Sequence, residues 1–144
     1  MRVVGIGGDG SFTEYKKTGF ELNNEEKILE TWFERNPQAI LENEQIFVIG
    51  RQVQTNLGTW IDLLGLDKTG NTVIIELKRD RTPRDTIAQA LEYCAFVAEL
   101  NSDQLEEIFR TYINDSEATI AQYHKEFFDL ADDETVVLML INAS

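Results

Sequence analysis

Two apolar runs rich in β-branched residues, residues 60–67 and 71–78, are separated only by Lys68-Thr69-Gly70. A three-residue loop with glycine in its last position is typical of a β-hairpin, because glycine readily adopts the left-handed conformation that this turn needs. The pattern therefore predicts two antiparallel strands in which Asp67 faces Asn71. The numbers of any two facing residues then add up to the same total, 138.

This register brings three ionisable side chains to one side of the hairpin. Asp62 falls opposite Glu76, with Cβ atoms about 5 Å apart, and Lys78 lies two residues further along on the same side. Two carboxylates this close repel each other unless a cation or a proton lies between them, and carboxylate oxygens suit Mg²⁺ or Mn²⁺. A neighbouring lysine can orient a water or balance charge on a phosphate. The geometry predicts metal-assisted phosphodiester hydrolysis, although a structural Lys–Glu pair beside an exposed aspartate fits it equally well.

The rest of the chain predicts an α/β domain. Further strands are expected at residues 12–20, 46–53 and 135–141, and helices from Asn23 or Asn24 to residue 35 and at 82–100, 102–113 and 116–130. Thr82 and Pro83 are typical of the first residues of a helix. Together with the hairpin, these elements predict a mixed central sheet of about four core strands flanked by helices.

Length and composition favour a single domain over residues 1–144, with a lead-in that contains a strand at 1–22 and an acidic helical part at 99–134. Of the 144 residues, 42% are hydrophobic, which is enough for one sizeable core. No apolar run approaches the roughly 20 residues that cross a bilayer, the N-terminus lacks the apolar stretch of a signal peptide, and a single cysteine suits a reducing cytosol. We therefore expect a cytoplasmic protein. The abrupt finish after the last expected strand also fits a fragment of a longer protein.

The charge of the chain is unevenly distributed. The formal net charge is −13, which by itself argues against a nucleic-acid ligand. Residues 51–84 nevertheless carry six basic residues against four acidic ones, whereas residues 99–134 carry two basic and eleven acidic residues. The centre of the chain is therefore locally positive, and the acidic part is expected to be a solvated helical face.

Two expectations concern the helices in the second half of the chain. The buried stripe of the helix at 82–100 is predicted from helical spacing to consist of Ile87, Leu91, Cys94, Ala95 and Ala98. His124 is the only histidine, which excludes a His-based triad and a His-rich metal site. Because it lies in an acidic helix without a partner cluster, we expect it at the surface.

The motifs around the hairpin resemble those of a known nuclease group. Asp62, followed by Glu76-Leu77-Lys78, resembles the signature of the PD-(D/E)XK nuclease superfamily, with Ile61 in place of the usual proline. The Gln89-Ala-Leu-Glu-Tyr93 stretch is similar to the Q-x-x-x-Y helix of the RecB-type branch. The whole phrase is most similar to NucS-like endonucleases, and the similarity covers roughly residues 20–100. The resemblance implies a restriction-endonuclease-like core.

The resemblance also implies roles for the residues of the predicted centre. Asp62 and Glu76 would hold the metal, and the backbone carbonyl of Leu77 would complete its shell. Lys78 would position or activate the attacking water, and Gln89 would support the centre from its helix.

Other roles are implied for residues at the edge of the centre. Glu30, with Glu26 as the alternative one turn earlier, matches a glutamate that many members place near the metal. Tyr93 would contact DNA or pack beneath the centre. The remaining implied DNA contacts are made by the basic residues Arg79, Arg81 and Arg84.

We therefore expect a DNA endonuclease that depends on Mg²⁺, or on Mn²⁺ in its place. The alternative is a catalytically inactive module that keeps the nuclease fold and binds nucleic acid or protein, which the acidic part of the chain favours. DNA is the expected partner in the first case. A homodimer, or a further domain or subunit that supplies specificity, is compatible with both.

Overall fold

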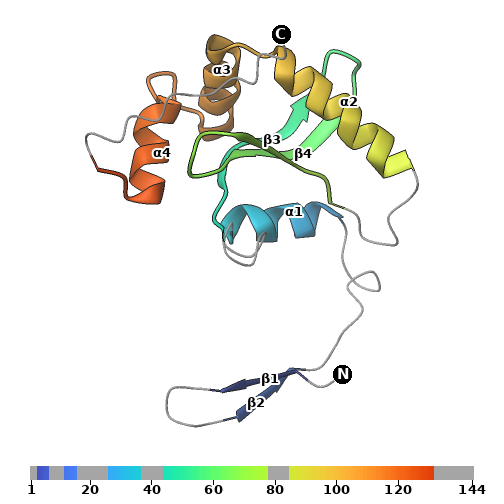
Figure 1. Ribbon diagram of the computed structural model, residues 1–144, viewed down its shortest axis with the longest axis vertical. Coiled ribbons are helices and arrows are strands. Elements are labelled where there is room, and N and C mark those ends of the chain that lie inside the picture. The colour runs from blue at the N-terminus through green and yellow to red at the C-terminus, as the bar shows by residue number, and fades with distance from the viewer. Residues whose placement is uncertain (1–2, 7–11, 16–25, 37–43, 78–84, 132–144) are drawn as a thin grey trace.

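The computed structural model describes residues 3–6, 12–15, 26–36, 44–77 and 85–131 of the chain (Figure 1). In chain order its elements are β1 (Val3–Ile6), β2 (Phe12–Tyr15), α1 (Glu26–Arg35), β3 (Phe47–Gln54), β4 (Trp60–Leu66), β5 (Thr72–Ile75), α2 (Asp85–Glu99), α3 (Ser102–Ile113) and α4 (Ile120–Phe128). Within these residues no helix is both long and apolar enough to cross a membrane.

The predicted hairpin is the centre of a three-stranded antiparallel sheet in the order β3-β4-β5. Its register is the predicted one, because Leu63 pairs with Ile75 and Leu66 with Thr72. The turn is also as predicted, since Gly70 has a φ of +88° and the Asp67 amide donates to the Asn71 carbonyl at 3.0 Å.

The sheet is smaller than the sequence predicts. The last strand, β5, ends at Ile75 rather than at residue 78, so the expected pair of Asp62 and Glu76 lies one step beyond the last paired residues. The described part of the chain contains three strands of this sheet rather than four, all antiparallel, and the strand expected at 135–141 lies outside it.

A second sheet lies near the N-terminus, where β1 and β2 pair as an antiparallel hairpin. The strand predicted at 12–20 is present as far as Tyr15. The sequence predicts no strand in residues 1–10, and there it is wrong, because β1 supplies the partner that β2 needs for its backbone hydrogen bonds.

Helices cover both faces of the three-stranded sheet. In Figure 1, α1 lies on one side of β3 and β4, and α2 and α3 lie on the other. A larger cluster of buried apolar residues fills the α2–α3 side and includes Ile49, Leu64 and Phe109. A smaller cluster fills the α1 side and consists of Ile46, Val48, Leu63, Ile75 and Leu77, with Phe33 of α1 packed against it.

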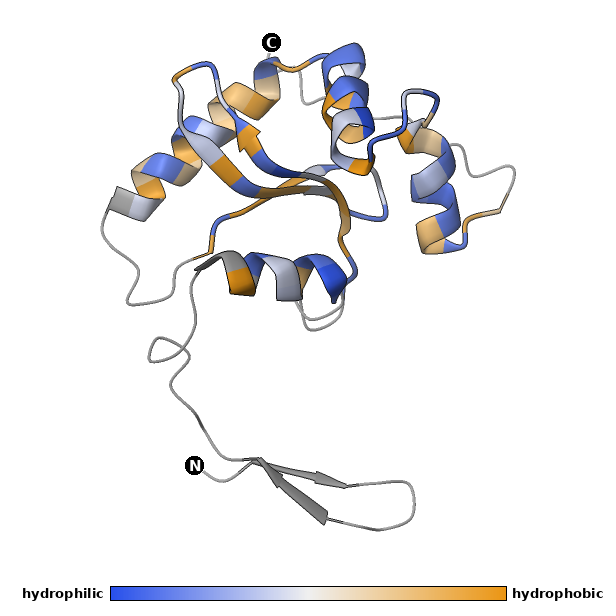
Figure 2. Cartoon of the chain, turned by 180° about the vertical axis from the view of Figure 1, so that it is seen from behind, coloured by the Kyte–Doolittle hydropathy of each residue, from blue (hydrophilic) through white to orange (hydrophobic). Residues whose placement is uncertain are grey.

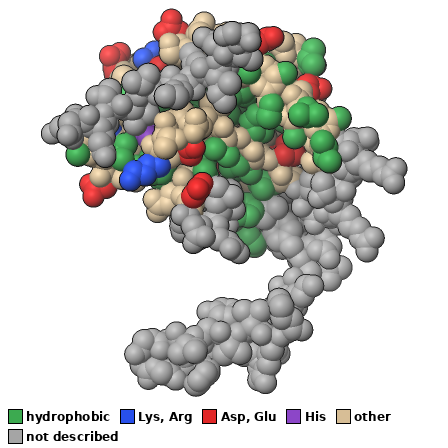
Figure 3. Space-filling model, in the orientation of Figure 1, with side chains coloured by type: hydrophobic (Ala, Val, Ile, Leu, Met, Phe, Trp, Pro, Cys, Tyr) green, Lys and Arg blue, Asp and Glu red, His purple; other side chains and the backbone are tan. Residues whose placement is uncertain are grey.

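The buried side of α2 differs from the predicted stripe. Tyr93, Val97 and the following Leu100 are the buried residues. Ile87 and Leu91 are 71% and 66% exposed, and Cys94, Ala95 and Ala98 are also exposed, so this prediction is wrong. Figure 2 shows apolar colours along most of α2, and Figure 3 shows hydrophobic side chains gathered where Figure 1 places this helix. Because α2 is apolar on two sides, spacing alone did not identify the side that packs.

Helix α1 exposes two apolar residues and buries a charged one. Phe33 packs against the smaller cluster, but Ile28 and Trp32 are 36% and 50% exposed. Glu30 is instead one of the most buried residues of the helix, with 3% of its surface exposed. Charged residues are rarely buried unless they are paired, so the position of Glu30 points to a polar site under α1.

Of the two remaining helices, α3 has the predicted bounds and α4 begins later than predicted. The N-cap of α3 is Asn101, which exchanges hydrogen bonds with Gln104 in a capping box. Helix α4 begins at Ile120 after the N-cap Thr119, four residues later than expected. His124 of α4 is fully buried and its Nε2 lies 2.7 Å from the Asp67 carbonyl oxygen, so the expectation of a surface histidine is wrong.

Candidate metal centre

Side chains from three elements converge on the predicted centre. The amide nitrogen of Gln52 on β3 lies 3.1 Å from Glu30 Oε1 of α1 and 3.1 Å from Asp62 Oδ1 of β4. The other oxygen of Asp62, Oδ2, accepts a 2.7 Å hydrogen bond from the backbone amide of Leu77. Both oxygens of Asp62 are therefore held by groups that come from other strands or from the chain just after β5.

Arg51 links the centre to α1 through two ion pairs. Its Nε donates to Glu30 Oε2 at 3.2 Å and one terminal nitrogen donates to Glu34 Oε2 at 2.9 Å. The hydroxyl of Tyr112 on α3 donates to Glu34 Oε1 at 2.7 Å. Burial and then the adjacent Glu34 carboxylate raise the pKa of Tyr112, so its hydroxyl stays protonated and keeps this bond. The buried charge of Glu30 is thus paired with a cation and fixed in orientation.

The regular alternation of side chains along β3 is interrupted at Gln52. Gln52 has a φ of +50°, which is uncommon for a residue other than glycine. Residues two apart in a regular strand share a side, yet Arg51 bonds to α1 while Val53 belongs to the larger cluster on the opposite side. On β4, Leu63 and Ile61 are divided between the two clusters in the same way. The local conformation of Gln52 therefore directs its side chain between α1 and β4.

Gln89 and Tyr93 lie beside the centre on α2. The Gln89 amide donates to the Tyr93 hydroxyl at 2.7 Å, and this hydroxyl donates to the Trp60 carbonyl at 2.6 Å. Burial raises the pKa of Tyr93 against the hydrogen bond from Gln89, and the negative charges of Glu76 and Asp62 raise it further. Both carboxylates are thus close enough to act on this phenol.

Tyr93 is fully buried. A direct contact with DNA would need an exposed side chain, so this geometry favours packing beneath the centre, which is the other role that the sequence allowed. Gln89 acts on the centre through the same phenol, because its amide holds the hydroxyl in place.

The predicted ligands of the centre are carboxylates, which are donors that Mg²⁺ and Mn²⁺ prefer. Within the described ranges, no group of three or more His, Cys, Asp or Glu side chains is arranged to hold a metal. Mg²⁺ is commonly bound through one or two carboxylates, with water completing its shell, so a site without a third acid is compatible with Asp62 and Glu76 as ligands, which stays a prediction. Glu30 is paired with the cation Arg51, whereas the two donors to Asp62 are neutral amides, so Glu30 suits a supporting role better than direct ligation.

Several predicted site residues lie outside the described part of the chain. They are Lys78, Arg79, Arg81, Arg84 and the side chain of Glu26. Their roles at the centre stay predictions. Leu77 is described and buried, and its amide serves Asp62, while its carbonyl remains the predicted metal ligand.

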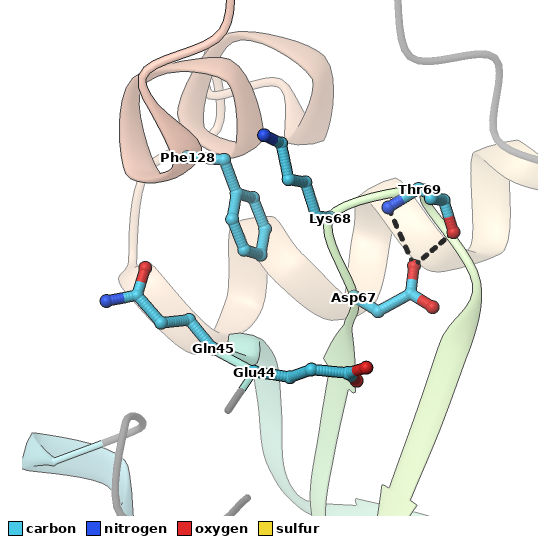
Figure 4. A pocket seen from close by; sticks show the side chains of 6 residues that line it. All are labelled: Glu44, Gln45, Asp67, Lys68, Thr69 and Phe128. Carbon is cyan, nitrogen blue, oxygen red and sulfur yellow. Dashed lines mark hydrogen bonds between the residues drawn. The ribbon is translucent and has the colours of Figure 1, made fainter. Parts of the chain in front are cut away.

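Two cavities lie near the sheet. A cavity of about 420 Å³ lies between β3 and α3, and Arg51 and Gln52 of the centre are in its wall. A cavity of about 450 Å³ lies at the hairpin turn between Glu44, Asp67, Lys68 and Phe128 (Figure 4). In Figure 4 the carboxylate of Asp67 is turned to Thr69, which donates to it twice, so this acid belongs to the turn. The first cavity therefore borders two residues of the centre, and the second belongs to the turn.

The sequence did not indicate Arg51 and Gln52 as parts of the site. They interrupt an otherwise apolar strand, residues 46–53, and such an interruption is the signal that could have been used. Two adjacent polar residues in an apolar strand indicate that a polar site lies against that strand.

The fold and the centre define an α/β domain with a buried acidic site between a helix and the end of a small antiparallel sheet. The chain matches the family described as the endonuclease NucS C-terminal domain over residues 25–136, and it belongs to that family. The resemblance to NucS-like endonucleases is thereby confirmed, and all residues of the predicted centre lie within the match. No solved structure matches the chain.

Proposed function

We propose that this domain is a Mg²⁺-dependent DNA endonuclease of the PD-(D/E)XK type, with Asp62, Glu76 and Lys78 as its catalytic residues. The observation that carries the proposal is the fixed carboxylate of Asp62, whose two oxygens are bonded to Gln52 and to the Leu77 amide. An acid oriented from two directions by neutral donors keeps its charge and its remaining lone pairs for a divalent cation, with Glu76 expected opposite it in the register.

Each residue of the centre would have a separate role in hydrolysis. Asp62 and Glu76 would hold the ion, and a bound Mg²⁺ would supply electrostatic stabilisation of the charge that develops on the phosphate. Lys78 would orient the attacking water and donate to a phosphate oxygen. Gln89 bonds to the hydroxyl of the buried Tyr93, and this ring would limit the access of water to the centre from the side of α2.

The charge pattern supports DNA as the substrate. The basic residues of a chain with net charge −13 are concentrated in the segment that contains the centre. A polyanion would be attracted to this segment and repelled from the acidic helices, so the charge distribution would orient DNA on the domain. Arg79, Arg81 and Arg84 are the predicted phosphate contacts.

The proposal is tested with purified protein, Mg²⁺ or Mn²⁺, and single-stranded, duplex, branched and mismatched DNA. Cleavage of at least one substrate is expected, together with loss of cleavage in Glu76→Ala and Lys78→Ala proteins and on addition of a chelator. Cleavage that is unchanged in both variants would show that the centre is wrongly assigned.

The second candidate is a module without catalysis that uses the same fold to bind nucleic acid or protein. The observation in its favour is that Asp62 already has a hydrogen-bond donor at each oxygen, so the site is stable without an ion. Titration calorimetry with Mn²⁺ separates the two candidates. A folded protein that binds no Mn²⁺ at millimolar concentration would favour the second.

A further inference from the structure

We propose that Gln52 is a positioning residue of the metal centre, whose side-chain amide holds the carboxylates of Asp62 and Glu30 at a fixed separation and orientation. The proposal rests on the proposed metal-dependent function and assigns a residue to it that the nuclease signature does not contain. It also gives a role to a glutamine that, with Arg51, follows an apolar run in its strand.

The contacts determine which end of the amide faces the acids. Gln52 Nε2 lies 3.1 Å from Glu30 Oε1 and 3.1 Å from Asp62 Oδ1. Ionised carboxylates only accept hydrogen bonds, so the group between them must be the nitrogen, which has two hydrogens to donate. Each hydrogen serves one acid, and the two carboxylates are linked through a single planar group.

The backbone of Gln52 is shaped for this role. Its φ of +50° lies in the left-handed region, which other L residues adopt rarely and which tends to occur at functional sites. At this residue β3 changes the side on which its side chains lie, since Arg51 reaches α1 and Val53 reaches the larger cluster. The unusual conformation therefore directs the amide between α1 and β4.

The chemistry of an amide suits a site that must attract a cation. A lysine or arginine between the two acids would also bring them together, but its charge would oppose the binding of a divalent ion. The glutamine amide donates two hydrogen bonds and adds no charge. Arg51 pairs with the far oxygen of Glu30 and with Glu34, whereas the Gln52 and Leu77 amides that bond to Asp62 are neutral.

Two substitutions separate the side chain from the backbone. Gln52→Gly removes the amide and relieves the left-handed conformation, whereas Gln52→Met keeps the length of the side chain and the backbone cost but cannot donate. Gln54→Gly is the matched control, because Gln54 is exposed on the same strand and lies two residues away. Circular dichroism identifies the variants that fold, and if only one variant at residue 52 folds, that variant decides.

The readouts are the dissociation constant for Mn²⁺ from calorimetry on the full chain and the Mn²⁺ concentration that gives half-maximal DNA cleavage. Both should rise about 10- to 100-fold in the Gly and Met variants, as for other residues that orient metal ligands, and stay within about twofold in Gln54→Gly. The maximal rate at saturating Mn²⁺ should change less than the half-saturating concentration. A structural defect alone would lower stability without this split.

Other outcomes overturn the proposal. Unchanged Mn²⁺ affinity in both variants would show that the amide does not position the acids. A loss in only one of two folded variants would assign the effect to the backbone or to packing. If the wild-type protein binds Mn²⁺ and cleaves DNA while both variants match it, only the role of Gln52 fails. If the wild-type protein binds no Mn²⁺, the proposed function itself fails, and the positioning role fails with it.

Discussion

Strand β4 carries one aspartate near its beginning and another just after its end, and the two are held in different ways. Asp67 accepts hydrogen bonds from the backbone and side chains of Thr69 and Asn71, all within four residues of it. Asp62 accepts hydrogen bonds from Gln52 and Leu77, which are ten and fifteen residues away. The first aspartate is part of a turn, and the second joins separate elements.

The two acids therefore depend on different amounts of the fold. The hydrogen bonds to the carboxylate of Asp67 form as soon as the hairpin turn forms, because all their donors lie in the turn. The environment of Asp62 exists only when β3, the end of β5 and, through Gln52, α1 are correctly packed. The conformation of Asp62 therefore depends on the packing of several elements, whereas that of Asp67 depends on the turn alone.

The largest expected effect separates the two aspartates by activity. Asp62→Asn should lower the rate of metal-dependent DNA cleavage at least about 100-fold, or about 2.7 kcal/mol, because the ion loses a charged ligand. Asp67→Asn should stay within about threefold of the wild type, since its acid lies at the far end of β4. The check is kcat/KM for one oligonucleotide at fixed Mg²⁺. Equal losses in both variants would break the comparison.

The next effect concerns the stability of the long-range centre. Arg51→Met should lower the free energy of unfolding by about 2 kcal/mol, because Glu30 would keep a buried charge without its cation. The partial exposure of Arg51 keeps the loss below that of a fully buried pair. Arg35→Met, at an exposed position on α1, is the control and should change stability by less than about 0.5 kcal/mol. Urea unfolding measures both, and a stable Arg51→Met protein would contradict the prediction.

The same contrast separates what the sequence predicts from what it does not. The register of β4 and β5 is correct because the turn chemistry of Lys68-Thr69-Gly70 acts within a few residues. The roles of Arg51 and Gln52 depend on how α1 packs on β3, and their partners on α1 are seventeen to twenty-two residues away. No local pattern marks Gln52 for a left-handed conformation, because glutamine is not a residue typical of it.

The buried face of α2 could not be predicted for another reason. The helix carries two apolar sides, one with Tyr93 and Val97 and one with Ile87 and Leu91. Both sides satisfy the helical period, so the choice depends on the shape of the sheet surface that α2 meets. The side with Tyr93 is favoured because the carbonyl of Trp60, at the beginning of β4, accepts a hydrogen bond from its hydroxyl.

A smaller effect is expected from the phenol beneath the centre. Tyr93→Phe should lower the free energy of unfolding by about 1.5 kcal/mol, because the Trp60 carbonyl and the Gln89 amide both lose their partner. Tyr123→Phe is the matched control, since its ring keeps the edge contact with Phe109, and should cost less than about 0.5 kcal/mol. Thermal unfolding of the two variants is the measurement. A larger loss for residue 123 would contradict the ranking.

The smallest effect tests the self-contained end of β4. Burial alone would raise the pKa of Asp67, but hydrogen bonds from Asn71 and Thr69 outweigh it, so the pKa falls below its ordinary value of 3.8. An acid whose pKa is lower in the folded state stabilises the fold at pH values above its unfolded pKa, and this contribution disappears as the pH falls through the folded value. Asp67→Asn should therefore cost about 1 kcal/mol at neutral pH, and the difference from wild type should vanish at acidic pH below that ordinary value. Urea unfolding across this range measures it, and a difference that does not depend on pH would show that the charge of Asp67 does not hold the turn.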